Sequence, residues 1–262
     1  FRVAPLSFIG PGGFVKWIAD GNEGDGRDHV DFSLDEGGES ILLLTTNATT
    51  YVLIDGITYA PQSRGVSQGR LPDDSATFAF FPGSATPADG NYRLAPVVIS
   101  EILTHADSPL EDAVEIHNPG SQAVNIGGWF LSNTRENLKK FRVPDNTTVP
   151  AGGFVTLTQS QFGNNGANSF TFNSTIGDEA WLSAADASGT LTGLRAGAAF
   201  GPAANGVSFG RIVTTVGVDH APMAARSLGS ANGAPLIGPL ILSEVHYNPA
   251  GDGEEYVELH NS

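Results

Sequence analysis

Paired glutamates are the first feature of this 262-residue sequence that could do chemistry. Glu101 and Glu115 lie in apolar runs, and the same arrangement recurs at Glu244 and Glu258. Further carboxylates lie between the members of each pair, namely Asp107, Glu111 and Asp112 in the first and Asp252, Glu254 and Glu255 in the second. Together these oxygens could bind Ca²⁺, which takes about six to eight hard ligands. The alternative, which we favour, is that the strand glutamates face water or cap the loop through its backbone amides.

A second acidic stretch, DGNEGDGRDHVD from Asp20 to Asp31, has part of the spacing of an EF-hand loop. Its twelfth position is Asp31, where an EF-hand has Glu, and no helical pattern flanks it. We therefore expect a solvated, glycine-rich turn, with weak calcium binding as the alternative.

The remaining reactive residue types do not form a predicted active site. No pair among the six histidines has the spacing of a zinc site, and His117 and His260 are expected to be exposed strand residues. The run GVSFG, Gly206 to Gly210, is not interpreted as a nucleophile elbow, and no leaving-group pocket is apparent near the glutamates. We assign no catalytic, cofactor-binding or metal-binding residue and no cofactor, and we expect no enzyme.

The composition excludes several classes of function. The net charge is −15, and the 13 Lys and Arg residues are spread along the sequence, so no basic patch for nucleic acid is predicted. The sequence has no cysteine, which excludes disulfides, thiol catalysis and cysteine-ligated zinc. No apolar run approaches the roughly 20 residues of a membrane span, so membrane insertion is not expected. This acidic, cysteine-free chain suits an exported bacterial protein.

Short strands separated by turns are predicted throughout. Val97–Leu103 and 113–117 are β-branched runs, and Trp129–Leu131, 154–157 and 180–182 are apolar runs that follow turn signals. Asp186–Gly189 has the composition of a hairpin turn, and no segment has helical periodicity. The pattern predicts an all-β chain of antiparallel β-sandwiches.

Internal similarity divides the chain into repeats of about 141 residues. Phe1–Val15 resembles Phe141–Val155, Gly65–Arg70 resembles Gly206–Arg211, and PVVISEI at Pro96 resembles PLILSEV at Pro239. On this interpretation 1–93 is a copy without its opening strands, 96–236 is a complete copy, and 239–262 is the opening strand pair of a third.

These motifs resemble the bacterial form of the lamin tail domain. The resemblance rests on a strand ending in Ser-Glu, the run EYVELHN at Glu255–Asn261, the Gly-Gly-Trp before Phe130, and the Gly-Arg-Leu-Pro-Asp run at Gly69. It implies tandem immunoglobulin-like β-sandwiches and no catalytic residues. Such modules occur in large exported and surface proteins.

The sequence therefore favours a non-catalytic structural or adhesive repeat of a long extracellular or cell-surface protein. Its expected partners are adjacent repeats or further copies of itself, and a further hypothesis is fibre assembly by strand exchange between chains. The alternative is an accessory carbohydrate- or cell-wall-binding module of a secreted enzyme. Trp17, Trp129 and Trp181 could form its sugar platform, but core packing is favoured for the last two because they lie in apolar runs.

Overall fold

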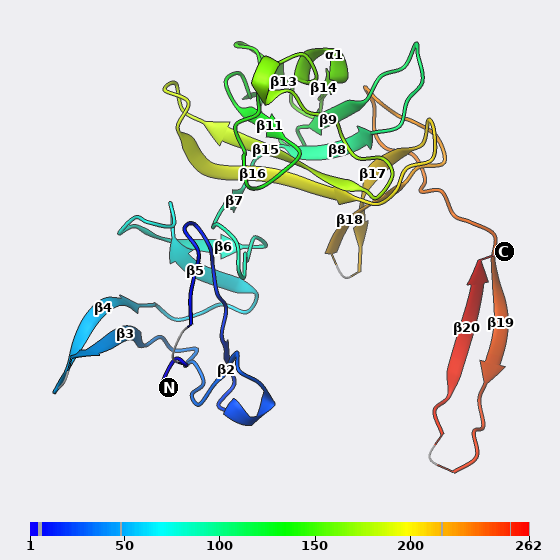
Figure 1. The fold of residues 1–262 in the computed structure, drawn as a ribbon. Coiled ribbons are helices and arrows are strands. Elements are labelled where there is room, and N and C mark those ends of the chain that lie inside the picture. Colours follow the sequence, from blue (N-terminus) through cyan, green and yellow to red (C-terminus); the bar gives the residue numbers. More distant parts are fainter. Residues whose placement is uncertain (5–6, 48, 216, 252, 262) are drawn as a thin grey trace. The chain divides into compact units, whose positions relative to one another are not determined.

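The computed structural model describes residues 1–4, 7–47, 49–215, 217–251 and 253–261. It divides into two compact units, which are described separately (Figure 1). Unit 1 consists of Phe1–Leu94 and Thr192–Arg195, and unit 2 of Ala95–Leu191 and Ala196–Ser262. No helix among these described residues is long and apolar enough to span a membrane.

Unit 2 contains two sheets that form a β-sandwich. The first sheet has the order β14-β9-β8-β17-β18, and the second β12-β11-β15-β16-β7. The first sheet consists of β8 (Val98–Leu103), β9 (Ala113–His117), β14 (Phe154–Thr158), β17 (Ser208–Thr214) and β18 (Gly217–Pro222). The second consists of β11 (Phe130–Ser132), β12 (Phe141–Arg142), β15 (Asp178–Ala185) and β16 (Leu191–Phe200). The strand β7 (Arg93–Leu94) belongs to unit 1, as do Leu194 and Arg195, the residues of β16 with which it pairs. Smaller elements are β10 (Val124–Asn125), β13 (Thr148–Val149), α1 (Gln159–Phe162) and η2 (Gly166–Asn168).

The core of unit 2 lies between these sheets. Fully buried side chains include Ile102 and Ile116 from the first sheet and Leu131 and Leu182 from the second. Burying each such side chain contributes about 1.5–3 kcal/mol. A ring cluster extends this core, with consecutive centroids 4.9–5.7 Å apart, and consists of Phe162, Phe170, Phe172, Phe200 and Phe209.

The sequence prediction of an all-β, immunoglobulin-like sandwich is confirmed. The runs expected to be strands became β8, β9, β11, β14 and β15, and each boundary differs by at most a few residues. The turn expected at Asp186–Gly189 joins β15 to β16, where the Gly189 amide donates to the Asp186 carbonyl. The described helical elements are a single turn of α-helix and two 3-10 turns, consistent with the lack of helical periodicity.

Unit 1 has a much smaller core. Its elements are β1 (Ile18–Ala19), η1 (Glu23–Asp25), β2 (His29–Val30), β3 (Ser40–Asn47), β4 (Thr50–Thr58), β5 (Val66–Arg70), β6 (Phe78–Pro82) and β7. The strands pair as β1-β2, β3-β4 and β5-β6. Phe81 and Val30 are buried, whereas apolar side chains along both β3 and β4 are exposed, including Leu42 and Leu53. This unit leaves much apolar strand surface without a second layer.

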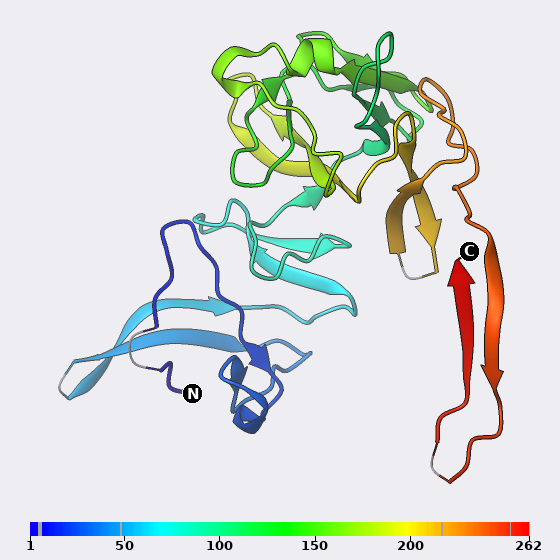
Figure 2. The same cartoon turned by 45° about the vertical axis from the view of Figure 1, so that its right-hand side comes forward.

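The hairpin of β19 (Leu240–His246) and β20 (Tyr256–Asn261) is a two-stranded ribbon (Figure 2). Every residue of β19 is exposed, including Leu242 and Val245. Because a two-stranded ribbon is marginally stable alone, this apolar hairpin lacks the packing that stabilises the strands of unit 2.

We predict that Ile116→Ala lowers the free energy of unfolding of unit 2 by about 2–5 kcal/mol, because truncation of this fully buried side chain leaves a cavity. The matched control is Val213→Ala, since Val213 is an exposed strand residue of the same unit and its removal should change stability by about 0.5 kcal/mol or less. Chemical denaturation of both variants followed by circular dichroism measures the difference. Equal effects of the two substitutions would contradict this assignment of the core.

Candidate functional site

The glutamate pair Glu101 and Glu115 is the most unusual polar feature of unit 2, because both side chains are 0% exposed. The two residues lie opposite each other on β8 and β9. A β-bulge between Ile99 and Glu101 shifts the register, so that Ile99 and Ile102 point to the core while Glu101 and Glu115 lie on the other face. The expectation that these glutamates face water was wrong.

Glu101 accepts hydrogen bonds from three groups, two of which belong to the turn after β18. The Ser208 hydroxyl donates at 2.5 Å, and the Ser227 hydroxyl donates at 2.6 Å. The Ser227 amide lies 3.0 Å from each carboxylate oxygen. Buried carboxylates are tolerated when hydrogen-bond donors satisfy their oxygens, as they do here.

Glu115 binds the same turn from the neighbouring strand. Its carboxylate accepts the Ser100 hydroxyl at 2.6 Å and the backbone amide of Gly229. Burial raises the pKa of Glu115; the Ser100 and Gly229 hydrogen bonds lower it, and the neighbouring Glu101 carboxylate raises it further. The glutamates therefore do cap backbone amides, but those of Ser227–Gly229 and not those of the acidic loop that joins their strands.

The hairpin β19–β20 has the same pair of glutamates, but the turn Ser227–Gly229 does not bind them. Glu244 lies opposite Glu258, and a register shift again occurs just before the first glutamate, between Leu242 and Glu244. The Ser243 hydroxyl donates to Glu258 at 2.5 Å, as the Ser100 hydroxyl does to Glu115. The hairpins thus share a local structure, although Ile116 is 0% exposed and its counterpart Leu259 is 62% exposed.

Of the three loop acids of unit 2, Asp107 and Glu111 are held by protein donors. Asp107 accepts the Asn205 side-chain amide at 2.5 Å, and Glu111 accepts the Ser160 backbone amide at 2.6 Å. Asp112 is buried, and this burial raises its pKa. Among the described residues these acids do not gather into a three-ligand group with the buried glutamates. In the other hairpin, Asp252 lies outside the described residues, and the neighbouring Glu254 and Glu255 are exposed.

Within the described residues, a group of three potential metal ligands lies in the glycine-rich stretch Asp20–Asp31 of unit 1. One ligand atom each of Asp20, Asp25 and His29 lies within 4.8 Å of the others. His29 Nδ1 lies 2.7 Å from Asp20, and the Asn22 amide also donates to that carboxylate. The Asn22 hydrogen bond is the main cause that lowers the pKa of Asp20. Such internal bonds stabilise a turn, and they leave the calcium alternative untested.

The histidines do not all fit the expectation of exposed strand residues. His220 on β18 is buried, and its Nε2 lies 3.0 Å from the Ile99 carbonyl. His117 is half-buried and stacks on Phe154, with ring centroids 4.4 Å apart. Burial is the main cause that lowers the pKa of both histidines. The His260 side chain, which shares the position of His117 in the similar hairpin, is exposed as expected.

Two runs, Gly206–Gly210 and Gly65–Gly69, have the Gly-X-Ser-X-Gly spacing of a nucleophile elbow. The spacing therefore does not exclude a nucleophile elbow, and the local structure decides. An elbow holds its serine on a sharp turn between a strand and a helix. Ser208 instead begins the extended strand β17 and donates its hydroxyl to Glu101. In this structure the serine positions a carboxylate.

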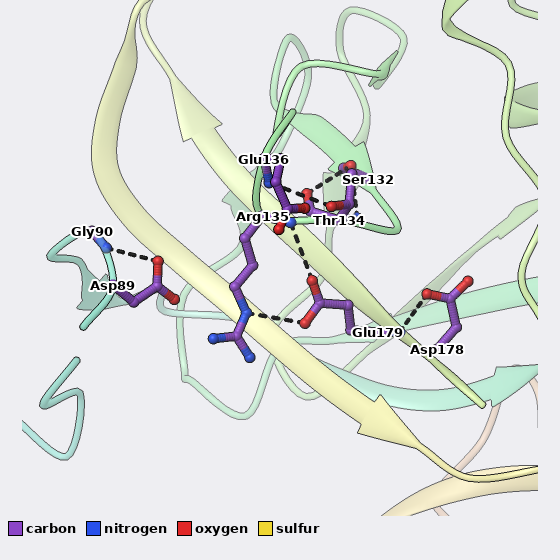
Figure 3. Close-up of polar contacts among 8 residues, drawn as sticks. All are labelled: Asp89, Gly90, Ser132, Thr134, Arg135, Glu136, Asp178 and Glu179. Carbon is purple, nitrogen blue, oxygen red and sulfur yellow. Dashed lines mark hydrogen bonds and ion pairs between the residues drawn. The ribbon is translucent and has the colours of Figure 1, made fainter. Parts of the chain in front are cut away.

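Figure 3 shows how the loop after β11 is fixed over β15. The Arg135 amide and Nε donate to the two carboxylate oxygens of Glu179, at 3.1 and 3.0 Å. The Arg135 guanidinium lies 4.9 Å above the Trp181 ring, which it covers. Trp129 and Trp181 are both buried, as expected from their apolar runs, whereas Trp17 is 38% exposed. Arg70 also braces a loop, by donating to the Ser75 carbonyl and to Asp55.

Part of the chain matches a known protein family. Residues 92–197 match the family model described as Lamin Tail Domain. No curated protein and no solved structure matches the chain. The matched range contains Glu101 and Glu115, whereas Ser208, Ser227 and Gly229, which bind these carboxylates, lie beyond it. Sequence reasoning missed those donors, although the recurrence of Ser67 and Ser208 in one motif was a usable signal.

We predict that Ser227→Ala lowers the free energy of unfolding of unit 2 by about 1.5–3 kcal/mol, because a buried carboxylate loses a hydroxyl donor. Ser230→Ala is the matched control, since the Ser230 hydroxyl bonds only the Ser227 carbonyl in an exposed turn and should contribute about 1 kcal/mol or less. Equilibrium denaturation measures stability, and amide hydrogen exchange at Gly229 reports whether the turn opens. Equal effects of the two substitutions would contradict the importance of the carboxylate contact.

We also predict a pH dependence that arises from His220. The folded state lowers its pKa, so below the ordinary value of about 6.5 the unfolded state binds more protons. Stability should therefore fall as the pH decreases from about 7 to 5. The raised pKa of Glu115 acts in the opposite direction, and comparison with His220→Gln isolates the histidine.

The Gln variant retains a donor for the Ile99 carbonyl and should show a smaller loss of melting temperature over this range. His246→Gln, at an exposed position, should retain the pH slope of the unsubstituted chain. Thermal unfolding at several pH values measures these slopes. Identical slopes for the unsubstituted chain and His220→Gln would show that another group controls the response.

Proposed function

We propose that this chain is a non-catalytic structural or adhesive segment of a long extracellular or cell-surface bacterial protein, built from tandem lamin-tail-like modules. The family match at 92–197 and the β-sandwich of unit 2 support the module type. Assembly with further copies or with adjacent repeats, and not the conversion of a substrate, is the proposed activity. The buried carboxylates Glu101 and Glu115 support this reading, because their hydrogen bonds join parts of the fold.

Tandem organisation is supported by the likeness between separate parts of the chain. The β8–β9 and β19–β20 hairpins share their pairing register, their bulge and their Ser-to-Glu hydrogen bond. The turns at Gly12 and Gly152 also agree. Both glycines have positive φ, and the following glycine donates to the residue three positions earlier in each case. An exported location is supported by the acidic, cysteine-free composition.

The observation that carries the proposal of assembly is that the β19–β20 hairpin is exposed, whereas the similar β8–β9 hairpin is buried in the sandwich. Val114 and Ile116 are completely buried, whereas Val257 and Leu259 at the same register positions are about 60% exposed. An exposed apolar hairpin with two free edges is a template for pairing with another sheet. Strand exchange between chains would bury this surface and give an open, head-to-tail fibre.

We predict that purified 1–262 forms oligomers whose size increases with concentration. Sedimentation velocity and light scattering measure the distribution. Val257→Lys with Leu259→Lys should shift the chain towards monomer, because charged side chains cannot be buried in the pairing surface. The matched control is Val213→Lys with Val218→Lys, on another exposed strand pair of unit 2. A monomer at all concentrations would contradict strand exchange.

The alternative, a carbohydrate- or cell-wall-binding module, gives a different result. Of the three tryptophans only Trp17 exposes much of its surface, so Trp17→Ala should abolish binding in a glycan array or a cell-wall pulldown if this alternative is correct. The structural proposal expects no binding in either assay.

A further inference from the structure

We propose that unit 1 is the receptor for the β19–β20 hairpin of a second copy of this chain, and that Glu244 and Glu258 bind the turn Thr86–Asp89 of that copy. This inference rests on the proposed function and adds the partner site, the register and the residues that select them. It follows from comparing unit 1 with unit 2, each taken by itself.

Unit 1 contains the turn that the glutamates bind in unit 2. The Asp89 amide donates to the Thr86 carbonyl at 3.0 Å, and the Ser230 amide donates to the Ser227 carbonyl at 2.8 Å. Ala88 has φ of 64°, which is unusual for a residue other than glycine, and Gly229 has φ of 89°. Thr86–Asp89 therefore has the backbone form of Ser227–Ser230.

The same asparagine braces both turns. The Asn91 side-chain amide donates to the Arg70 carbonyl at 3.0 Å, and the Asn232 amide donates to the Arg211 carbonyl at 3.2 Å. The Thr86 hydroxyl donates to Asn91, as the Ser227 hydroxyl does to Asn232. Each turn is thus fixed against the last residue of its Gly-Val-Ser-X-Gly-Arg motif.

The two turns differ in whether carboxylates bind their donors. In unit 2 the turn donors bind Glu101 and Glu115, together with the Ser208 hydroxyl. Within the described part of the chain, the hydroxyl of Ser67 and the amides of Thr86 and Ala88 have no hydrogen-bond partner. These three groups are the counterparts of the donors on Ser208, Ser227 and Gly229. Unit 1 therefore has a donor set that fits two carboxylates.

The surface next to β5 has room for a strand. In unit 2, β17 pairs with β8 along Ser208–Gly210, and those residues are buried. The counterpart residues Ser67–Gly69 pair only with β6 among the described strands and are half-buried. Ser67 and Gln68 line a cavity of about 430 Å³ whose other walls include Ile41, Ile57 and Tyr59. An incoming apolar strand would fill this mostly apolar space.

The other edge also matches the hairpin. In unit 2, β14 pairs with β9 so that Thr156 lies opposite Glu115. The counterpart segment Phe14–Ile18 follows the same Gly-Gly turn, and its apolar side chains are exposed. The register of unit 2 would place Lys16 opposite Glu258. The attraction between these opposite charges would favour binding of the β19–β20 hairpin. The full order would be Phe14–Ile18, β20, β19, β5 and β6, which reproduces the order of the first sheet of unit 2.

Cysteine cross-linking tests this register in a chain that has no cysteine of its own. Phe209 lies opposite Ile102 in unit 2, so Gln68 of one copy should lie opposite Val245 of the next. Residues 1–262 with Gln68→Cys and residues 1–262 with Val245→Cys, tagged differently and mixed under mild oxidation, should form the mixed disulfide. Leu242→Cys is the matched control, since it is three residues along the same strand, about 10 Å away. The Val245→Cys mixture should yield at least about tenfold more mixed disulfide.

A second pair of substitutions tests the carboxylate contact. Ser67→Ala on the receiving copy removes one donor and should reduce the yield several-fold, whereas the control Ser63→Ala, at an exposed position, should leave it unchanged. Glu244→Gln with Glu258→Gln on the donating copy should reduce it about tenfold. The control is Glu254→Gln with Glu255→Gln, which makes the same charge change in the exposed loop of the hairpin.

Each other outcome overturns the inference in a distinct way. Oligomers without the mixed disulfide would overturn this receptor site and leave the proposed assembly standing. A disulfide that forms within the doubly substituted Gln68→Cys, Val245→Cys chain, but not between mixed single variants, would show that the hairpin closes on its own chain. Monomers without any disulfide would contradict both this inference and strand exchange.

Discussion

The contact between two buried carboxylates and one turn is the constraint on which unit 2 depends. Glu101 lies near the start of the unit, and its partner Ser227 lies 126 residues later. A charge this deeply buried is stable only while donors satisfy its oxygens, so strand and turn must be present together. The hydrogen bonds thereby fix the last segment of the unit over the face of the sheet that the core does not use.

The same constraint explains the contrast between unit 2 and the other β elements. Unit 1 has the turn, the asparagine brace and the motif serine, but within the described residues no carboxylate accepts a hydrogen bond from the Ser67 hydroxyl or from the Thr86 and Ala88 amides. The β19–β20 hairpin has the carboxylates and the bulge, but no turn covers it. Correspondingly, the apolar residues of β9 are buried, whereas most of those on β3 and β4 and those on β19 and β20 are exposed. The carboxylate contacts and the burial of apolar side chains are missing together, because one strand pair, such as β8–β9 in the sandwich, provides both.

Much of the fold could be predicted from the sequence, because β-branched runs and turn residues act locally. The strand at 113–117 and the hairpin turn at Asp186 appear where they were expected. The direction of the glutamates could not be predicted from alternation, because one extra residue in a β-bulge reverses which face a side chain occupies. The burial of His220 was missed for a related reason, since it depends on a neighbouring strand, β17, and on the distant Ile99 carbonyl.

By itself, the sequence determined the class of fold, the positions of most strands and the internal likeness from which partners can be inferred. The tertiary structure alone decided that the acidic pair is buried, that its ligands are Ser208, Ser227 and Gly229, and that the Gly-X-Ser-X-Gly serine lies in a strand. The physical reason is the range of the interactions. Strand and turn propensities act over a few residues, whereas the satisfaction of a buried carboxylate requires donors that only folding brings from more than a hundred residues away.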